Sequence, residues 1–378
     1  MLETANVNIE KDGEHFAMLY YKNKAIKVNK DYFDILDYSE LDGFVWEKQI
    51  INRDFTDTDH HDSMFRRFIW LISGQDVERY NTFKSIIGYL LHSYKTSANN
   101  RAIILNDETV SDTPNGGSGK GIFMNAIGHM KRLSAIDGKT FDFNKSFAYQ
   151  TVQSDCQVLC YDDVRRNFDF ERLFSQITEG ITIEYKNQGA IKLPVQESPK
   201  ILITTNYTIK TTGGSFERRV FEVELSNYFG AHYTPLQEFG VMLFDGWDSL
   251  EWMKFDKFMI NCLQYYLENG LVKSTPKNLA LRKFINETCQ EFYESVEDNN
   301  IPTDQRLNKG EIYQKFREEN DDMKFLTKRL FGKWVKTYAT FKKLGYQDGN
   351  TNGVRWFALV SNSMNESEDI FKDNVAPF

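Results

Sequence analysis

The strongest chemical signal in the sequence is a run of small residues that ends in a lysine. It reads Asn115-Gly116-Gly117-Ser118-Gly119-Lys120-Gly121. Glycines let successive backbone N–H groups turn towards one phosphate, and a helix that starts here would aim its N-terminus at the same anion. Lys120 would then reach the β- and γ-phosphates of a nucleotide. The run predicts a phosphate-binding loop, with an ordinary glycine-rich turn as the alternative.

This run departs from the common phosphate-loop pattern G-x-x-x-x-G-K-[ST] at two positions. Pro114 stands where the first glycine is expected, and Gly121 stands where a hydroxyl would bind Mg²⁺. The missing hydroxyl predicts either water-mediated metal binding or weaker hydrolysis.

Paired carboxylates follow a second apolar run. Residues 158–161 resemble a buried strand, and Asp162 and Asp163 come directly after it. In phosphoryl-transfer enzymes one such carboxylate holds the metal and another orients the attacking nucleophile. We assign the metal to Asp162 and the attacking water to Asp163, with an ordinary aspartate turn as the alternative.

Two further segments carry polar side chains at strand ends. Residues 201–205 predict a buried strand that ends at Asn206, whose amide could position water or contact the γ-phosphate. Arg218 and Arg219 precede the alternating strand 220–225, where an arginine could neutralise a phosphoryl group bound by a neighbouring subunit. The alternatives are a turn-forming asparagine and weak surface ion pairs.

Short apolar runs alternate with helical segments through the middle of the chain. This alternation predicts an α/β fold with a parallel sheet, whose strand ends gather the polar side chains at one edge. The expected helices cover 121–133 and 170–178. Residues 181–195 differ, because they alternate about a polar stretch at 186–189 and so predict a hairpin.

The flanking regions predict helices and short strand pairs. Residues 15–29 predict a hairpin, and 62–94 predict two helices from their apolar spacing. Residues 246–298 are helical and rich in aromatic residues, which indicates a core stripe. Two helices within 309–341 and a strand pair at 345–360 predict a winged helix-turn-helix.

Composition limits the class of protein. The chain has 378 residues, 41% hydrophobic and 15% aromatic, so it can build buried cores. Its net charge of −8 excludes a wholly basic nucleic-acid binder but allows local basic surfaces. The 4 cysteines are too sparse for a disulfide framework, and no stretch resembles a signal peptide or a membrane span. These features indicate a reducing cytoplasm.

Two polar segments stand outside the motifs. Residues 323–345 carry many cations and no acid, so this helix could contact DNA phosphates or could simply be a solvated amphipathic helix. Residues 57–62 have metal-ligand types without fixed spacing, so we expect a solvated loop that caps the next helix.

The order of the motifs resembles the superfamily 3 helicases, an AAA+ class of viral and mobile-element replication proteins. The most specific stretches are 183–187 and 199–206, which resemble the hairpin and sensor segments of papillomavirus and polyomavirus helicases. The layout of the flanks resembles the phage and plasmid primase-helicase group of poxvirus type. The resemblance in the motifs covers about residues 101–225.

The resemblance implies ATP and Mg²⁺ as cofactors and gives the motifs their roles. Lys120 resembles the phosphate-loop lysine, Asp162 the metal carboxylate and Asp163 the catalytic carboxylate. Asn206 resembles the sensor. Gly121 departs from the family pattern, which leaves direct Mg²⁺ ligation open.

The resemblance also implies a ring that moves along DNA. Arg219 resembles the arginine finger, with Arg218 as a second candidate, and such a residue acts only across a subunit boundary. A homo-hexamer is therefore expected. Lys186 and Asn187, at the hairpin tip, resemble the pair that tracks single-stranded DNA in the central channel.

The implied fold is an AAA+ P-loop ATPase core between a helical N-terminal region and a C-terminal winged helix. The expected boundaries are a small N-terminal region with a β-hairpin at 1–60, a helical collar at 61–100, the core at 101–245, a helical linker region at 246–300 and the winged helix at 301–378. The expected partners are single-stranded and forked DNA, with no membrane. Nothing resembles a primase active site, so any primase would be a separate protein.

The function that these features favour is ATP-driven translocation and unwinding of DNA in phage or mobile-element replication. The expected location is the cytoplasm of a bacterial or phage-infected host cell. An ATP-gated replication initiator or loader that binds DNA without unwinding it is the alternative, which Gly121 favours. A third alternative is an ATPase acting on protein partners, against which Lys186 and the winged helix argue.

Overall fold

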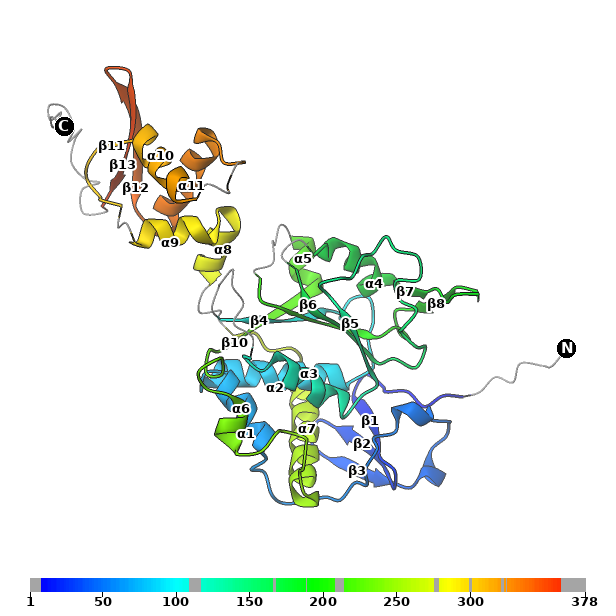
Figure 1. The fold of residues 1–378 in the computed structure, drawn as a ribbon. Coiled ribbons are helices and arrows are strands. Elements are labelled where there is room, and N and C mark those ends of the chain that lie inside the picture. Colours follow the sequence, from blue (N-terminus) through cyan, green and yellow to red (C-terminus); the bar gives the residue numbers. More distant parts are fainter. Residues whose placement is uncertain are drawn as a thin grey trace. The chain divides into compact units, whose positions relative to one another are not determined.

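We describe a computed structural model of the chain, shown in Figure 1. It describes residues 8–108, 117–165, 168–187, 189–207, 214–274, 279–298, 301–320, 323 and 325–361. The chain forms two compact units, 1–277 and 278–378, whose boundary falls within the range 246–300 expected to form a helical linker. In the described part of the chain, no helix combines the length and apolar character that crossing a membrane requires.

The first unit begins with a small antiparallel sheet followed by two helices. The strands are β1 (Phe16–Tyr20), β2 (Ala25–Asn29) and β3 (Phe33–Leu36), and β1 and β2 form the hairpin that the sequence predicts. The helices are α1 (Met64–Ile72) and α2 (Val77–Leu91), and α2 packs along the long helix α7 (Ser249–Asn269). The predicted break between α1 and α2 lies at Ser73 and Gly74, where Gly74 has a φ of +70°.

A five-stranded sheet lies at the centre of this unit, and every strand pair in it is parallel. Its order is β10 (Val220–Leu225), β4 (Ala102–Asp107), β9 (Lys200–Thr205), β6 (Val158–Val164) and β5 (Leu133–Asp137). Four strands, β10, β4, β9 and β6, are buried over most of their length because both faces of the sheet are covered. The predicted α/β fold with a parallel sheet is confirmed.

Successive residues of each strand enter two different cores. Ile103 and Leu105 of β4 join the core formed with α1, α2, α3 (Lys120–Gly128) and α7. Ala102 and Ile104 join the core formed with α4 (Leu173–Glu179) and the hairpin of β7 (Gly180–Ile183) and β8 (Ile191–Pro194). Side chains on a strand alternate between its faces, so one strand anchors helices on both sides of the sheet.

The helix in the structure is shorter than the expected helix over 121–133. The α3 helix ends at Gly128, and β5 begins at Leu133. Strand β5 forms one edge of the sheet and is mostly half-exposed or exposed. Such a strand needs no apolar run, so its sequence carries little strand signal, and pairing with β6 decides its structure.

Two shorter helices complete the described part of the first unit. Helix α5 (Gly214–Arg219) leads directly into β10. Helix α6 (Pro235–Phe239) has a capping box in which Thr234 accepts from the backbone of Gln237.

The second unit combines helices with a small antiparallel sheet (Figure 1). Its elements are α8 (Leu279–Glu287), α9 (Gln290–Asp298), β11 (Leu307–Asn308), α10 (Lys309–Glu319), α11 (Lys328–Phe341), β12 (Gly345–Thr351) and β13 (Val354–Val360). Buried rings of Phe292, Phe316 and Trp334 pack against one another between the helices. The two helices and the strand pair predicted within 309–360 are confirmed, and β11 adds a short third strand.

Candidate functional site

The loop before α3 has the backbone conformation that its glycines predict. Gly117 and Gly119 both have a φ of +107°, which residues with side chains rarely adopt. A Cβ atom at Gly119 would lie 2.6 Å from the ring of Phe68 on α1, so this glycine also satisfies a space requirement. Gly119 is the N-cap of α3, and Lys120 is therefore the first residue of the helix.

Three other predicted positions of the phosphate-binding loop, Asn115, Gly116 and Gly121, make no described contact at the site. Asn115 and Gly116 lie outside the described residues. Gly121 is exposed, and no atom lies within 4 Å of the position its Cβ would take. The described structure thus leaves room for a serine or threonine at 121, and the missing hydroxyl has no steric explanation.

The Lys120 ammonium group is held by oxygen atoms from several elements. Its Nζ donates to Asp107 Oδ2 at 2.6 Å, to Asn206 Oδ1 at 2.5 Å and to Ser118 Oγ at 3.2 Å. Only 12% of the Lys120 side chain is exposed. The ammonium group thus lies among acceptors that a phosphate could replace, since phosphate oxygens accept the same charge-assisted bonds.

Asp107 is a site residue that the sequence analysis missed. It ends β4, directly beside the carboxyl end of β10, and its side chain is 12% exposed. Asp107 stands at the end of an apolar run, as Asp162 and Asn206 do. The same sequence signal could therefore have identified Asp107 as a candidate site residue.

Asp162 and Asp163 occupy a bulge in β6. Tyr161 pairs with Ile203 of β9 and Val164 pairs with Thr205, so an extra residue is inserted between these pairs. Asp163 has a φ of +55°, a conformation that is uncommon for a residue other than glycine. Such strained positions concentrate at functional sites, and here the bulge turns two neighbouring carboxylates towards the end of the sheet.

The hydroxyl of Thr204 fixes this bulge, and the sequence analysis did not identify it. The Asp163 N–H donates to Thr204 Oγ1 at 2.7 Å, and Thr204 Oγ1 donates to Asp162 Oδ1 at 2.6 Å. Thr204 is 1% exposed. One buried hydroxyl therefore contacts both predicted residues, through the backbone of Asp163 and the carboxylate of Asp162.

Asn206 connects the lysine to the carboxylates. Its Oδ1 accepts from Lys120, and its Nδ2 donates to Asp163 Oδ1 at 3.2 Å. The sheet order explains this, because β9 lies between β4 and β6, and Asn206 directly follows β9. The structure thus joins Lys120, Asn206 and Asp163 in one continuous chain of hydrogen bonds.

Lys139 is a second basic group at the site, also missed by sequence reasoning. It lies just beyond β5, and its Nζ is 2.5 Å from Asp163 Oδ2. This hydrogen bond raises the pKa of Lys139 above its ordinary value. Its side chain is 56% exposed, so it can exchange this partner for a ligand anion at little cost.

The donor set suits nucleotide bound with magnesium. Asp162 would hold the ion, and among the residues described no three His, Cys, Asp or Glu side chains form a metal-binding group. Mg²⁺ commonly uses one or two protein carboxylates and takes its other ligands from water and phosphates. The residues therefore fit a magnesium ion that arrives with a nucleotide, and they do not form an independent metal cage.

The two arginines lie at the other end of the sheet. Arg219 ends α5 immediately before Val220, and Val220 pairs with Ala102 at the start of β4. Lys120 contacts Asp107 at the end of the same strand. The Arg219 guanidinium carbon lies 5.0 Å from the centre of the Phe174 ring of α4, and Arg218 is exposed. The structure therefore does not bring the arginines to the Lys120 site of their own chain.

Lys186 and Asn187 lie at the tip of the predicted hairpin. Strands β7 and β8 pair antiparallel from Gly180 with Pro194 to Ile183 with Ile191. Both tip side chains are exposed, and Asn187 has a φ of +63°. The hairpin prediction is confirmed.

The polar segment 57–62 pairs with lysines of α7. Asp57 lies 2.8 Å from Lys257, and Asp62 lies 3.1 Å from Lys254. The cap of α1 is Ser63, whose side chain accepts from the backbone of Arg66. The segment is thus a loop, as predicted, but the predicted capping of α1 by residues 57–62 is wrong, because Ser63 is the cap.

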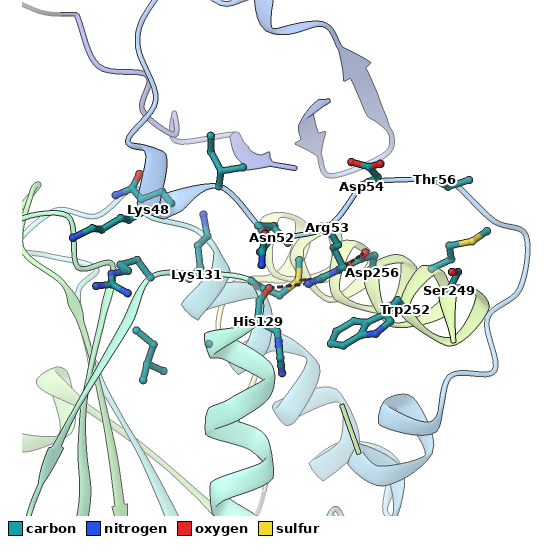
Figure 2. A pocket seen from close by; sticks show the side chains of 18 residues that line it. Lys48, Asn52, Arg53, Asp54, Thr56, His129, Lys131, Ser249, Trp252 and Asp256 are labelled. Carbon is teal, nitrogen blue, oxygen red and sulfur yellow. Dashed lines mark hydrogen bonds and ion pairs between the residues drawn. The ribbon is translucent and has the colours of Figure 1, made fainter. Parts of the chain in front are cut away.

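A cavity of about 650 Å³ lies elsewhere in the first unit, between the segment 48–56, the end of α3 and the start of α7 (Figure 2). Arg53 donates to Asp256 Oδ2 at 2.9 Å and to the carbonyl of His129 at 3.1 Å, and it stacks 4.7 Å from the Trp252 ring. His129 caps the carboxyl end of α3. None of the predicted site residues lines this cavity, so its groups join the N-terminal segment to α3 and α7.

Comparison with solved structures finds neighbours of low sequence identity, one of which is a helicase by name. The A form of the apo NrS-1 C-terminal region is 12% identical, with 92% of this chain and 97% of that chain covered and a TM-score of 0.39. A JCV helicase bound to an acetamide compound is 10% identical, with 62% and 61% covered and a TM-score of 0.34. A full-length MCM homolog from Methanopyrus kandleri is 10% identical, with 79% and 62% covered and a TM-score of 0.28.

No family model and no curated protein matches the sequence. Every TM-score quoted is below 0.5, so the role of each residue has to follow from the geometry of the site.

Proposed function

We propose that this protein is an ATP-dependent DNA helicase of replication that translocates on single-stranded DNA as a ring. The observation that carries the proposal is the hydrogen-bonded chain from Lys120 through Asn206 to Asp163. It lies where the left-handed glycine loop and the N-terminus of α3 meet the carboxyl end of a parallel sheet. Open α/β sheets bind ligands at this edge, and phosphates bind at such helix N-termini.

ATP binding would rearrange the contacts of Lys120. The β- and γ-phosphate oxygens would replace the Asp107 and Asn206 oxygens around its ammonium group, while the N–H groups of the glycine loop would contact the same phosphates. Asn206 would then be available to contact the γ-phosphate or the attacking water. Magnesium, when bound, would neutralise charge on the phosphates.

Asp163 is the proposed group that orients and polarises the attacking water. Its carboxylate is already held by Asn206 and Lys139, and its backbone by Thr204. A carboxylate fixed in this way loses little freedom when the reaction geometry forms. Thr204 also donates to Asp162 Oδ1, and Asp162 would hold the metal with its other carboxylate oxygen.

Hydrolysis would need a second subunit. Arg219 lies at the opposite end of the sheet from Lys120, so it could reach a γ-phosphate only in a neighbouring copy. We propose a ring, most simply a homo-hexamer, in which Arg219 acts as the arginine finger and Arg218 as a second candidate. The exposed tips of the β7–β8 hairpins, with Lys186 and Asn187, would then line a central channel and follow the DNA backbone.

The remaining assignments follow from this proposal. The range 1–60 would be a small N-terminal region, 61–100 a collar, 101–245 the ATPase core, 246–300 a helical linker region and 301–378 a winged helix. Single-stranded and forked DNA would be the substrates during phage or mobile-element replication in a bacterial cell. Any primase would be a separate protein.

An ATP-gated initiator that does not unwind DNA is the second candidate, and Gly121 favours it. Both candidates predict ATP binding, but only the helicase couples hydrolysis to strand separation. The test measures ATP hydrolysis with and without single-stranded DNA, together with unwinding of a forked duplex. Hydrolysis stimulated by DNA with strand separation supports the helicase; DNA binding that depends on ATP without strand separation supports the initiator.

A further inference from the structure

A third carboxylate, that of Asp107, lies at the proposed phosphate site beside the two that the sequence predicts. Asp107 ends β4, and only 12% of its side chain is exposed. Its Oδ2 accepts from Lys120 Nζ at 2.6 Å, and the same ammonium group donates to Asn206 Oδ1 at 2.5 Å. Asn206 in turn donates to Asp163. Two side chains thus connect Asp107 to the proposed catalytic carboxylate, although no motif assigns Asp107 a role.

The residues on both sides of Asp107 are fixed to other parts of the fold. Asn106 is 1% exposed, and its side-chain oxygen accepts from the Asp107 N–H at 2.9 Å. The Glu108 N–H donates to the carbonyl of Leu225 at the end of β10. The Glu108 carboxylate pairs at 2.6 Å with Arg79 of α2, whose side chain is buried. The anchoring of both neighbours therefore fixes the position of the Asp107 carboxylate.

A carboxylate at this position opposes nucleotide binding unless a cation accompanies the nucleotide. In the proposed function the phosphates take Lys120 from Asp107, which leaves the carboxylate close to phosphate oxygens. Like charges held close together repel, and more strongly where solvent is largely excluded. Lys139 does not relieve this repulsion, because its ammonium group pairs with Asp163 at 2.5 Å. A divalent cation between Asp107 and the phosphates would convert the repulsion into attraction.

The glycine at position 121 leaves such a cation one oxygen ligand short. The common phosphate-loop pattern places a serine or threonine there, whose hydroxyl binds Mg²⁺. Gly121 cannot supply this oxygen, although no atom lies within 4 Å of the position its Cβ would take. Mg²⁺ in nucleotide sites commonly uses one or two protein carboxylates. Asp162 is the first carboxylate of the proposed site, and Asp107, which contacts the lysine of the loop, is in place to be the second.

We propose that Asp107 is a ligand of the Mg²⁺ that arrives with ATP and that it supplies the oxygen that Gly121 lacks. This inference rests on the proposed function, because it requires ATP and magnesium to bind beside Lys120. Without nucleotide, Asp107 is the counter-ion of Lys120. With nucleotide bound, Lys120 contacts the phosphates and Asp107 contacts the ion. The carboxylate thus has a cationic partner in both states.

The test measures binding of a fluorescent derivative of the non-hydrolysable ATP analogue AMP-PNP to the full chain, by anisotropy, in excess Mg²⁺ and in EDTA. For the wild type, Mg²⁺ should strengthen binding. Asp107→Asn should bind the analogue about tenfold more weakly in Mg²⁺, because a metal ligand is lost, and about tenfold more tightly in EDTA, because the repulsion is lost. The effect of Mg²⁺ on affinity should therefore fall about 100-fold, which is the product of the two changes.

A second substitution tests whether Asp107 replaces the missing hydroxyl. Gly121→Ser added to Asp107→Asn should restore most of the effect of Mg²⁺, since it returns an oxygen ligand at the usual place. Gly121→Ala is the matched control, because it also replaces the glycine of the helix but brings no hydroxyl, and it should restore nothing. Rescue by serine also demonstrates that the Asp107→Asn chain is folded. Asp137→Asn, which removes an exposed carboxylate at the end of β5, should bind the analogue as the wild type does.

The outcomes separate this inference from the proposed function. Tighter binding of Asp107→Asn by the same factor in Mg²⁺ and in EDTA would overturn the inference and leave Asp107 as a counter-ion only. An unchanged effect of Mg²⁺ in Asp107→Asn, or no difference between serine and alanine at position 121, would also overturn it. In these cases the wild type still binds the analogue, so the proposed ATP site stands. A wild type that binds no analogue would refute the ATP site and this inference together.

Discussion

At the residue scale, Lys120 illustrates how a charged group can be held ready for a ligand. Three oxygen acceptors surround its ammonium group, and one of them belongs to Asp107. Burial of a cation is costly unless it is paired, so these contacts hold the side chain in place, and under the proposed function phosphate oxygens would replace them.

Lys120→Ala should impair both nucleotide binding and turnover, because it removes the main cation of the phosphate site. Asp163→Asn should retain ATP binding but lose turnover, since the amide cannot polarise the attacking water. Removing a transition-state group of this kind typically costs about 10²-fold or more in rate. Steady-state hydrolysis and equilibrium ATP binding measure the two effects, and wild-type turnover in either variant would refute the assignment.

Thr204→Val should lower kcat about tenfold with little change in KM for ATP. The variant keeps the shape of the side chain but removes the acceptor of the Asp163 N–H and the donor to Asp162. A part-buried donor without an acceptor costs about 1–3 kcal/mol, which is enough to misplace the carboxylates. The phosphate-binding groups stay intact, so affinity for ATP should remain.

The matched control for this variant is Thr205→Val. Thr205 is equally buried, and its hydroxyl donates to the carbonyl of Val164 and contacts no carboxylate. Both variants should lose similar stability in thermal unfolding. If both also lose kcat equally, Thr204 has only a structural role.

At the element scale, the β7–β8 hairpin places a lysine where its charge remains solvated. Lys186 is exposed at the tip, and the strands below it are anchored by Ile181, Ile183 and Leu193 in the second core. A cation at such a tip can meet a phosphate without the burial cost it would face in a core.

Lys186→Ala should therefore keep basal ATP hydrolysis and assembly but lose hydrolysis stimulated by DNA and strand separation. Lys22 lies in the turn of the N-terminal hairpin, and Lys22→Ala is the control that should behave as wild type. Unwinding rates on a forked duplex provide the measurement. A Lys186→Ala protein that unwinds at the wild-type rate would show that this hairpin does not translocate DNA, and would favour the initiator.

Buried lysines lie where the N-terminal segment meets the parallel sheet, and they predict how stability depends on pH. Burial lowers the pKa of Lys95 to about 8 and the pKa of Lys200 well below its ordinary value. Lys95 donates to the carbonyl of Ser198, and Lys200 donates to the carbonyl of Tyr89 at 2.6 Å. Both groups sit between α2, its following loop and the start of β9.

Stability should rise as pH increases from about 8 towards 10, the sign that a lowered lysine pKa requires. In this range the unfolded chain keeps a proton that Lys95 has released in the folded chain, so raising the pH favours folding. Lys95→Met should reduce this rise by about 2 kcal/mol between pH 8 and 9.5, measured as the free energy of unfolding in urea. An exposed control, Lys22→Met, should leave the pH dependence intact, and an equal slope in both variants would contradict the prediction.

At the scale of the whole molecule, the parallel sheet separates the groups that would act on one ATP. The residues that would bind the phosphates lie at the carboxyl end of β4, and Arg219 lies at the amino end of β10. A strand of six residues spans roughly 20 Å, so no small side-chain movement could unite these groups within one chain. The proposed role of Arg219 therefore requires a neighbouring subunit.

Arg219→Ala should leave ATP binding by each protomer largely intact and abolish hydrolysis that depends on the ring. Mixing it with Lys120→Ala protomers should restore part of the activity, because each variant supplies the group that the other lacks. Titration of one variant into the other, followed by hydrolysis, measures the recovery. An active wild-type monomer, together with no recovery at any mixing ratio, would exclude the role in trans.

The motifs and most elements follow from local sequence. Left-handed glycines beside Lys120, carboxylates at the end of an apolar run and the alternation around 186–189 are consequences of backbone sterics and strand periodicity, which act over a few residues. These rules were enough to predict a parallel α/β core, the β7–β8 hairpin and the two helices of the second unit that precede its strand pair.

Only the tertiary structure reveals the order of the strands and, with it, the neighbours of Lys120. Asp107, Thr204 and Lys139 come from three different strands or strand ends, and their contacts depend on β9 lying between β4 and β6. The edge strand β5 also depends on tertiary structure. Its mostly half-exposed residues form a strand because β6 provides backbone hydrogen-bond partners. Strand order is decided by how the connecting helices pack on the sheet, which is a long-range property that no short segment of sequence contains.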